Sequence, residues 1–101
     1  MPMTMKIVEA EPKTKKRYTA IFRLHKGGKV IKITHFGQRG GKTYIDEGDK
    51  EKRKNFRARH KGDLKTKDFK RAGFLSMGLL WGEHTSLLKN IEAYKKKYNL
   101  D

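Results

Sequence analysis

The fold is decided by residues 18–36, YTAIFRLHKGGKVIKITHF. Every second residue from Tyr18 to Leu24 is apolar, and the run from Val30 to Phe36 is rich in β-branched residues. Gly27-Gly28 lies between the two runs, which predicts an antiparallel β-hairpin closed by a primed turn. Because an isolated hairpin is only marginally stable in water, the rest of the chain is expected to cover one of its faces.

The segment before the hairpin, residues 1–16, is expected to form a basic N-terminal arm or an edge strand. Residues 6–10 have the composition of a strand, and Pro12 ends it because proline has no N–H to give to a sheet. The remainder, residues 17–101, is expected to be a single α+β domain, since the whole chain of 101 residues has the usual size of one domain.

Helices are expected after a glycine-rich loop that extends over residues 37–49. The first runs from about Lys50 to Lys61, starts beside the acidic residues 46–49 and ends at Gly62. Carboxylates suit that position because the first turn of a helix has free N–H groups.

Two further helices complete the expected order of elements. The segment Phe69–Trp81 is apolar on nearly every side, which indicates a buried helix, with Asp68 as its cap and Gly82 at its end. The last helix begins near Thr85 or Ser86. Its apolar stripe consists of Leu87, Leu88, Ile91, Tyr94 and Tyr98, with Lys89, Glu92 and Lys96 facing out. Strands followed by about three helices predict an α+β fold with the helices packed on one face of an antiparallel sheet.

The charge of the chain is strongly positive: 26 Lys and Arg face 11 Asp and Glu, for a net charge of +15. Residues 1–36 and residues 37–71 carry +7 each, whereas residues 72–101 carry only +1. Self-repulsion of this size opposes a compact fold unless counter-charge is near. The composition therefore predicts a polyanionic partner, either the phosphate backbone of a nucleic acid or an acidic protein surface.

Other classes of protein are disfavoured by the same composition. The chain has no cysteine, which favours a reducing compartment over secretion. The first residues lack the apolar core of a signal peptide, and the longest apolar run, residues 74–81, is far shorter than a membrane-spanning helix. No membrane insertion and no small-molecule substrate are expected.

The predicted helix over residues 50–61 carries the clearest interaction signal. Five cations fall at spacings that place them on one face of the helix, namely Lys50, Arg53, Lys54, Arg57 and Lys61. Like charges at these spacings destabilise an isolated helix, whereas a polyanion would reward them. The expected binding surface also includes Arg39 and Lys42 from the glycine-rich loop and the basic run Lys13, Lys15, Lys16 and Arg17. The alternative is a solvated face that Glu47 and Glu51 partly neutralise.

Three residues are expected to act as structural clamps rather than as a site. Phe56 is the only large apolar residue on the face opposite the cations, and Arg59 and His60 lie three and four positions after it. One of the two should point inward and find a carboxylate or carbonyl partner, because an unpaired buried charge is costly. Trp81 is expected in the core, with a base-stacking role as the minor alternative.

Enzymatic chemistry has little support in the sequence. Gly40-Gly41-Lys42-Thr43 resembles part of a phosphate-binding loop, but Phe36 stands where the first glycine of that motif belongs. The four histidines lack metal-ligand spacing, and the carboxylates of residues 46–49 are explained by a helix start. We therefore expect no catalytic residue, no bound metal and no cofactor; a metal-dependent nuclease is the minor alternative.

From Phe36 onward the chain resembles a known family. The residues that carry the resemblance are Phe36-Gly37, Tyr44, Asp49, Phe56-Arg57-Ala58-Arg59-His60, Ala72-Gly73-Phe74-Leu75-Ser76, Leu80-Trp81 and Thr85-Ser86-Leu87. Over about residues 36–98 this pattern is similar to a small uncharacterised family of basic proteins encoded by large and giant DNA viruses of algae and amoebae.

The resemblance implies a virion context and no catalytic role. It favours a non-enzymatic minor structural protein of the capsid or virion core, which bridges acidic capsid-protein surfaces through its basic face. The alternative is a nucleic-acid-binding protein that contacts or condenses the genome. Either way the protein is expected in the virion, and in the host cytoplasm or nucleus during infection.

Overall fold

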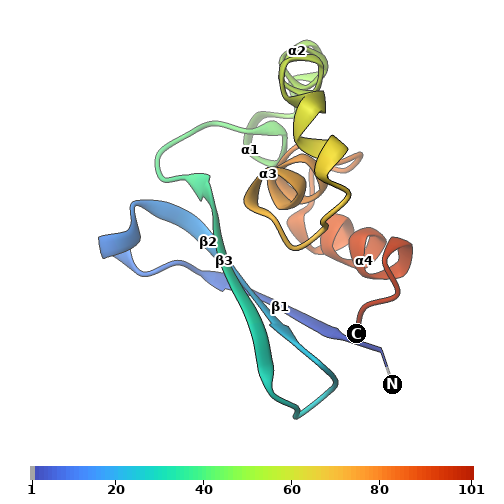
Figure 1. The fold of residues 1–101 in the computed structure, drawn as a ribbon. Coiled ribbons are helices and arrows are strands. Elements are labelled where there is room, and N and C mark those ends of the chain that lie inside the picture. Colours follow the sequence, from blue (N-terminus) through green and yellow to red (C-terminus); the bar gives the residue numbers. More distant parts are fainter. Residues whose placement is uncertain (1) are drawn as a thin grey trace.

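A computed structural model describes residues 2–101 of the protein (Figure 1). The fold is built on a three-stranded antiparallel sheet. The strands are β1 (Thr4–Glu9), β2 (Lys16–Arg23) and β3 (Val30–Gln38), in the spatial order β1-β2-β3. In this register Phe22 lies opposite Met5 of β1, and Ala20 lies between Ile7 and Thr34. One face of the sheet therefore collects the apolar residues that the alternating pattern predicts.

The predicted hairpin forms, but its turn differs from the predicted one. The N–H of Leu24 donates to the carbonyl of Lys29 (3.1 Å), and the N–H of Gly28 donates to the carbonyl of His25 (2.8 Å). The connection is thus a four-residue loop instead of a two-residue primed turn, and Gly27 adopts a φ of +74° within it. Leu24 is 57% exposed and does not extend the buried stripe.

The segment before the hairpin is paired along its length. β1 forms an antiparallel ladder with β2, and a 3-10 turn, η1 (Pro12–Thr14), leads from one strand to the other. The outer edge of β1 is met by the last residue of the chain. The N–H of Met5 donates to the carbonyl of Asp101 and the N–H of Asp101 to that of Met3, both at 2.8 Å. Residues 4–9 are therefore an edge strand whose edge is partly closed.

The helical part is α1 (Tyr44–Glu47), α2 (Lys50–His60), η2 (Lys61–Thr66, 3-10), α3 (Ala72–Leu75), η3 (Ser76–Leu80, a π-helix) and α4 (Leu87–Lys97). The short helix α1 was not predicted. The helix predicted over about residues 50–61 is found as α2, which ends at His60. Gly62 does not stop the helical path, because the chain continues as 3-10 turns until Lys67, whose φ is +54°.

The predicted helix over residues 69–81 is shorter than expected and changes type. It begins at Ala72, and Asp68 does not cap it but accepts the N–H of Lys70 (3.0 Å). Its second half is a π-helix. An added Cβ at Gly78 would lie 2.6 Å from the ring of Tyr94, so the absent side chain lets η3 approach α4 closely. The stripe on α4 packs inward as predicted except for Leu88, which is 73% exposed.

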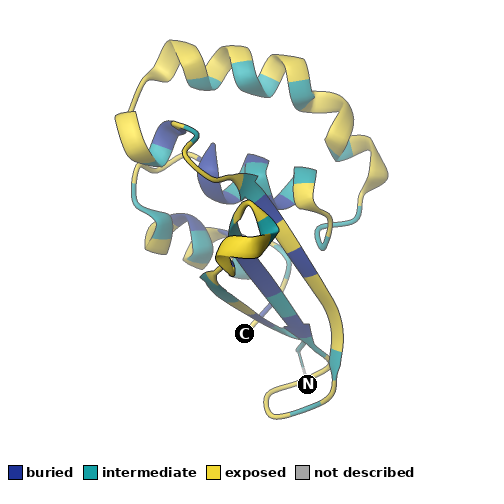
Figure 2. Ribbon diagram, turned by 90° about the vertical axis from the view of Figure 1, so that its left-hand side faces the viewer, coloured by how far each residue is buried: buried dark blue, intermediate teal, exposed yellow. Residues whose placement is uncertain are grey.

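The α+β arrangement expected from the sequence is confirmed, with helices gathered on one side of the sheet (Figures 1 and 2). The core lies between the sheet and η3, where Phe22, Phe36, Leu75, Leu79 and Leu80 are almost fully buried. Among residues 2–101, no helix combines the length and apolar character that crossing a bilayer requires.

Candidate functional site

One group of predicted contact residues meets at the end of the sheet where β2 begins. Arg17 forms a bidentate ion pair with Asp46 of α1, with Nη1 2.7 Å from Oδ2 and Nη2 2.6 Å from Oδ1. Asp46 also accepts the N–H and the hydroxyl of Thr43, each at 2.8 Å. The hydrogen bonds from Arg17 hold the pKa of the Asp46 carboxyl far below its usual range. Arg17 is therefore a tie between β2 and α1, and its fork is already occupied.

The glycine-rich loop joins this group. Arg39 donates from Nη2 to the carbonyl of Ala10 (2.9 Å), which fastens the loop to the end of β1. With Lys42 and Arg17 it lines a hollow of about 390 Å³, to which Glu9 also contributes. The remaining basic residues of the predicted set, Lys13, Lys15 and Lys16, are exposed in the adjoining turn. The structure therefore brings together the predicted residues from the arm and the loop.

The predicted cationic stripe on α2 is divided by the structure. Arg53 donates from Nε to the carbonyls of Trp81 (3.2 Å) and Gly82 (2.8 Å). Arg57 donates from Nη1 to the carbonyls of Met77 and Trp81, both at 2.9 Å. Burial lowers the pKa of Arg57, and the nearby charge of Arg53 lowers it further. These two arginines satisfy carbonyls at the end of η3, so they belong to the fold.

The apolar contact of α2 lies on the same face as these arginines. Phe56 stacks on Trp81 with the ring centroids 4.2 Å apart and the planes 9° from parallel. His60 stacks on the other side of the Phe56 ring, also at 4.2 Å, and its Nδ1 lies 3.4 Å from Oδ2 of Asp63. The prediction that Phe56 faces away from the cations is wrong, because positions 53, 56, 57 and 60 share one helical face.

The predicted clamps are corrected in part by these contacts. Trp81 is 6% exposed and His60 packs on Phe56, but Arg59 is exposed, and its side chain makes no hydrogen bond or ion pair within residues 2–101. Arg53 and Arg57 take the inward role expected of Arg59. The spacing of these two arginines around Phe56 was the signal in the sequence that could have indicated this.

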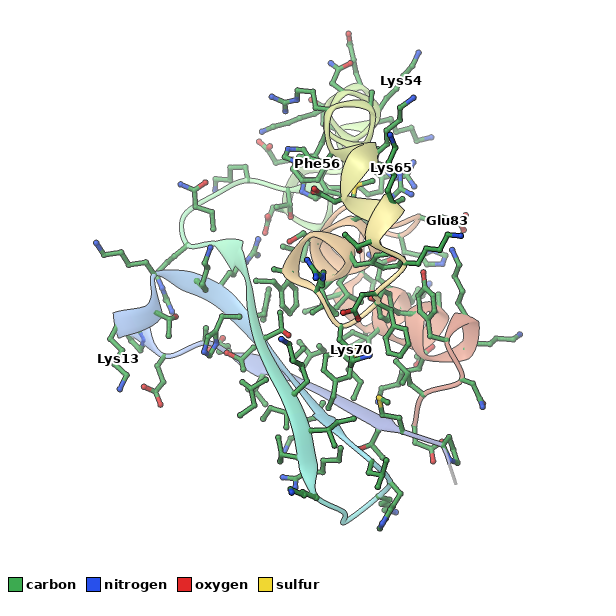
Figure 3. All side chains as sticks on the ribbon, in the orientation of Figure 1. Lys13, Lys54, Phe56, Lys65, Lys70 and Glu83 are labelled. Carbon is green, nitrogen blue, oxygen red and sulfur yellow. The ribbon has the colours of Figure 1, made fainter. Side chains whose placement is uncertain are left out.

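Several lysines of α2 and of the segment after it stay exposed. Lys50, Lys54 and Lys61 are exposed, and Lys54 extends away from the sheet (Figure 3). Lys65 and Lys67 of the segment that follows are also exposed, and sequence reasoning missed them. Glu51 is exposed nearby, whereas Glu47 is engaged by Lys52 at 2.9 Å. We call Lys50, Lys54 and Lys61, together with Lys65 and Lys67, the lysine face.

Arginine and lysine have different roles throughout the molecule. Five of the seven arginines donate hydrogen bonds to protein oxygen atoms, namely Arg17, Arg23, Arg39, Arg53 and Arg57. Of the nineteen lysines, only Lys13, Lys52 and Lys70 have a carboxylate oxygen within 4 Å in residues 2–101. Most arginines stabilise the fold, and most lysine charges face solvent.

The acidic cluster that suggested a metal site is engaged in structural contacts. Asp46 binds Arg17, Glu47 binds Lys52, and Asp49 caps α2 by accepting the N–H of Lys52 at 3.0 Å. Across the described residues 2–101, no three His, Asp or Glu side chains are grouped closely enough to hold a metal ion.

A cleft of about 350 Å³ lies between α2 and α4. Arg53 and Arg57 form one wall, and Asn90, Tyr94 and Lys97 form another. The Asn90 side chain is itself fully used: Oδ1 accepts the N–H of His84, and Nδ2 donates to the carbonyls of Leu79 and His84. Much of the polar lining of this cleft is therefore occupied by bonds that hold the loop over residues 82–86.

The fold and the surface define a small basic α+β protein in which most arginines stabilise the fold and most lysines face solvent. The chain belongs to a family of unknown function, DUF5754, whose model matches residues 7–60. The match extends from β1 to the end of α2, so it includes the hairpin. The matched region and the region of the predicted resemblance, about residues 36–98, share residues 36–60. No curated protein and no solved structure matches the chain.

Proposed function

We propose that the protein is a non-enzymatic structural component of a large DNA virus particle that bridges acidic surfaces through its exposed lysines. The viral setting rests on the resemblance over residues 36–98. The mode of contact rests on one observation, the division of roles between arginine and lysine described above.

The chemistry of lysine supports a contact of this kind. A lysine ammonium is a mobile, strongly hydrated point charge that accepts a carboxylate or a phosphate in many geometries. Reading of a base sequence instead depends on planar forks such as that of arginine. Because five of the seven arginines are bound to protein oxygen atoms, the surface suits contact that depends on charge and not on sequence.

The lysine face also has a cost that a partner would remove. Lys50 and Lys54 are one helical turn apart and repel each other, and Arg53 and Arg57 add positive charge from the inner side of the same helix. A net charge of +15 adds general self-repulsion. An acidic surface placed against α2 would stabilise both the helix and the fold.

Nucleic-acid binding is the second candidate, and the lysine face favours it too. Exposed lysines along one helix and the 3-10 turns after it can neutralise successive phosphates. Binding of that kind depends steeply on salt, because each neutralised phosphate releases a counterion.

The contact is tested with two fluorescent probes, poly-glutamate and a duplex DNA of random sequence, by anisotropy at several salt concentrations. Replacing Lys50, Lys54 and Lys61 by Gln should weaken binding to a probe that contacts the lysine face. The matched control replaces Lys89, Lys95 and Lys96 of α4 by Gln, which removes the same charge elsewhere. Equal loss in both variants, or no binding of either probe near 0.15 M salt, would refute the proposed contact.

The virion setting is tested separately. The chain should be found by mass spectrometry in purified, nuclease-treated virus particles at a constant ratio to the coat protein. If the chain is abundant in infected cells but missing from particles, the structural role is wrong, and nucleic-acid binding becomes the favoured function.

A further inference from the structure

The face of the sheet opposite the helices is apolar at its centre and carries no helix (Figures 1 and 2). Ile21 of β2 pairs with Ile33 of β3 on this face, and Val8 of β1 lies one pair further along. Ile33 is 54% exposed and Ile31, at the end of the same row, is 42% exposed. We call Val8, Ile21, Ile31 and Ile33 the aliphatic row.

The surroundings of the aliphatic row are basic and polar. Lys6 lies beside Ile21, Arg23 lies at the end of β2, and Thr19 bonds His35 through Oγ1 and Nδ1 at 2.7 Å. The strands carry one carboxylate between residues 4 and 38, that of Glu9, and the alternation places it with Tyr18 on the opposite face. The outward positions of the described strands thus combine aliphatic side chains with positive charge. At the β3 edge, Ile33 and His35 also line a hollow to which Asp63 and Asp68 contribute.

Three kinds of occupant fit this face poorly. A second copy would bring another +15 of charge and set Lys6 and Arg23 against their like. Stacked bases need aromatic platforms, but the aromatic residues of the sheet point inward: Phe22 and Phe36 are 0% exposed. A phosphate backbone gains nothing from exposed isoleucines.

We propose that this face docks an acidic protein surface whose apolar side chains pack on the aliphatic row and whose carboxylates lie beside Lys6 and Arg23. The proposal rests on the proposed contact with acidic surfaces and names protein as the partner on this face. Apolar contact surrounded by complementary charge is the usual anatomy of a protein interface.

The aliphatic row and the lysine face lie on different sides of the molecule. The lysine face lies on the helical side of the molecule, and the aliphatic row lies on the bare side of the sheet. Two partners can therefore bind at once, one through charge alone and one through charge and apolar contact. A protein that bridges two acidic surfaces needs two separate faces of this kind.

The test uses two acidic peptide probes that differ only in their apolar content, ten residues of alternating Glu-Val and ten of alternating Glu-Ser, with the duplex DNA as a third probe. The wild-type chain should bind the Glu-Val peptide more tightly than the Glu-Ser peptide. Ile33→Thr, which keeps a β-branched residue in the strand, should weaken Glu-Val binding about tenfold through lost apolar contact and leave the other two probes unchanged.

Two controls make the result specific. Leu88→Gln removes an exposed aliphatic side chain of similar size from α4 and should change no probe. Thermal unfolding followed by circular dichroism must show the same midpoint for wild type and variants. If Ile33→Thr changes this midpoint, Val8→Thr serves as a second variant of the aliphatic row.

Each contrary outcome has a distinct meaning. Equal affinity for the two peptides, or no effect of Ile33→Thr or Val8→Thr, overturns the inference while leaving the lysine contact intact. Failure to bind any of the three probes overturns the proposed function itself. A concentration-dependent dimer in sedimentation that Ile33→Thr abolishes would assign the face to a second copy and also overturn the inference.

Discussion

The hairpin and helix α2 are attached to the same core by opposite means. The hairpin contributes Ala20, Phe22 and Phe36, each 0% exposed, so it is held by buried apolar surface. Helix α2 has no buried residue and is held by Arg53, Arg57 and the stacked ring of Phe56. Figure 2 shows this contrast in the exposed surface of the helix at the top.

The difference indicates how this protein displays so much positive charge. A helix with seven basic residues in eleven, counting His60, has almost no apolar stripe to bury. Directed hydrogen bonds from two arginines to carbonyls replace that stripe, and the lysines on either side of these arginines stay exposed. Regions held by few buried contacts open more easily than the core, so α2 is expected to have lower local stability than the sheet.

The largest effect is expected from damage to the hairpin side. Phe22→Ala should lower the free energy of unfolding by about 3–5 kcal/mol, because it removes a fully buried ring and leaves a cavity. Urea unfolding followed by circular dichroism measures this. Leu24→Ala in the same hairpin is the control and should change little, since Leu24 is 57% exposed. Equal losses would mean that the hairpin is not held through its inner face.

A smaller effect is expected when the tie of α2 is cut. Arg57→Met keeps the stem of the side chain but leaves the carbonyl of Met77 without its charged donor and that of Trp81 with Arg53 alone, which should cost about 1.5–3 kcal/mol. Hydrogen exchange of the α2 amides should accelerate more than that of the β2 amides. The neighbouring exposed Arg59→Met should cost less than about 0.5 kcal/mol. Uniform acceleration across both regions would refute separate anchoring.

The same contrast explains how far the sequence alone could predict the structure. The apolar pattern of residues 18–36 was enough to predict the pairing of β2 with β3, because the alternation of side chains along a strand decides which of them are buried. The role of Arg53 and Arg57 could not be predicted, because cations at these spacings look the same whether they face phosphates outside or carbonyls inside. Those carbonyls lie 20 or more residues away and become available only where the π-helix η3 ends.

Local details were the least predictable for a similar reason. The position of Gly62 suggested a helix end, yet the chain continues in 3-10 turns to Thr66. The carboxylates of residues 46–49 were assigned to the start of the helix near Lys50. Asp49 does cap α2, but Asp46 lies in the unpredicted helix α1 and pairs with Arg17, 29 residues away. Such contacts depend on tertiary structure, which no local pattern contains.

The junction between the two regions should show a dependence on pH. The folded-state pKa of Asp46 lies below its unfolded value of 3.8, so the stability that this pair contributes is fully present above about pH 4 and is lost as the pH falls toward the folded-state pKa. Asp46→Asn should lower stability at pH 7 by about 1 kcal/mol and flatten the fall of the urea midpoint below pH 4. Asp49→Asn, which removes a carboxylate but keeps a helix cap, should leave the acid limb as in wild type. If Asp46→Asn retains the full acid sensitivity, the pair does not join β2 to α1 in solution.

The smallest effect should have the opposite sign, and it separates stability from binding on the lysine face. Lys54→Gln removes one partner of the repulsion with Lys50, so at low salt the free energy of unfolding should rise by about 0.2–0.5 kcal/mol. The gain should vanish in 1 M salt, where the Debye length falls to about 3 Å. The same variant should bind polyanions less tightly. Lys96→Gln on α4 is the matched control, because the last 30 residues carry a net charge of only +1. A loss of stability in Lys54→Gln would show that this lysine contributes to the packing of α2. The assignment of α2 packing to its arginines alone, with its lysines serving only in binding, would then be wrong.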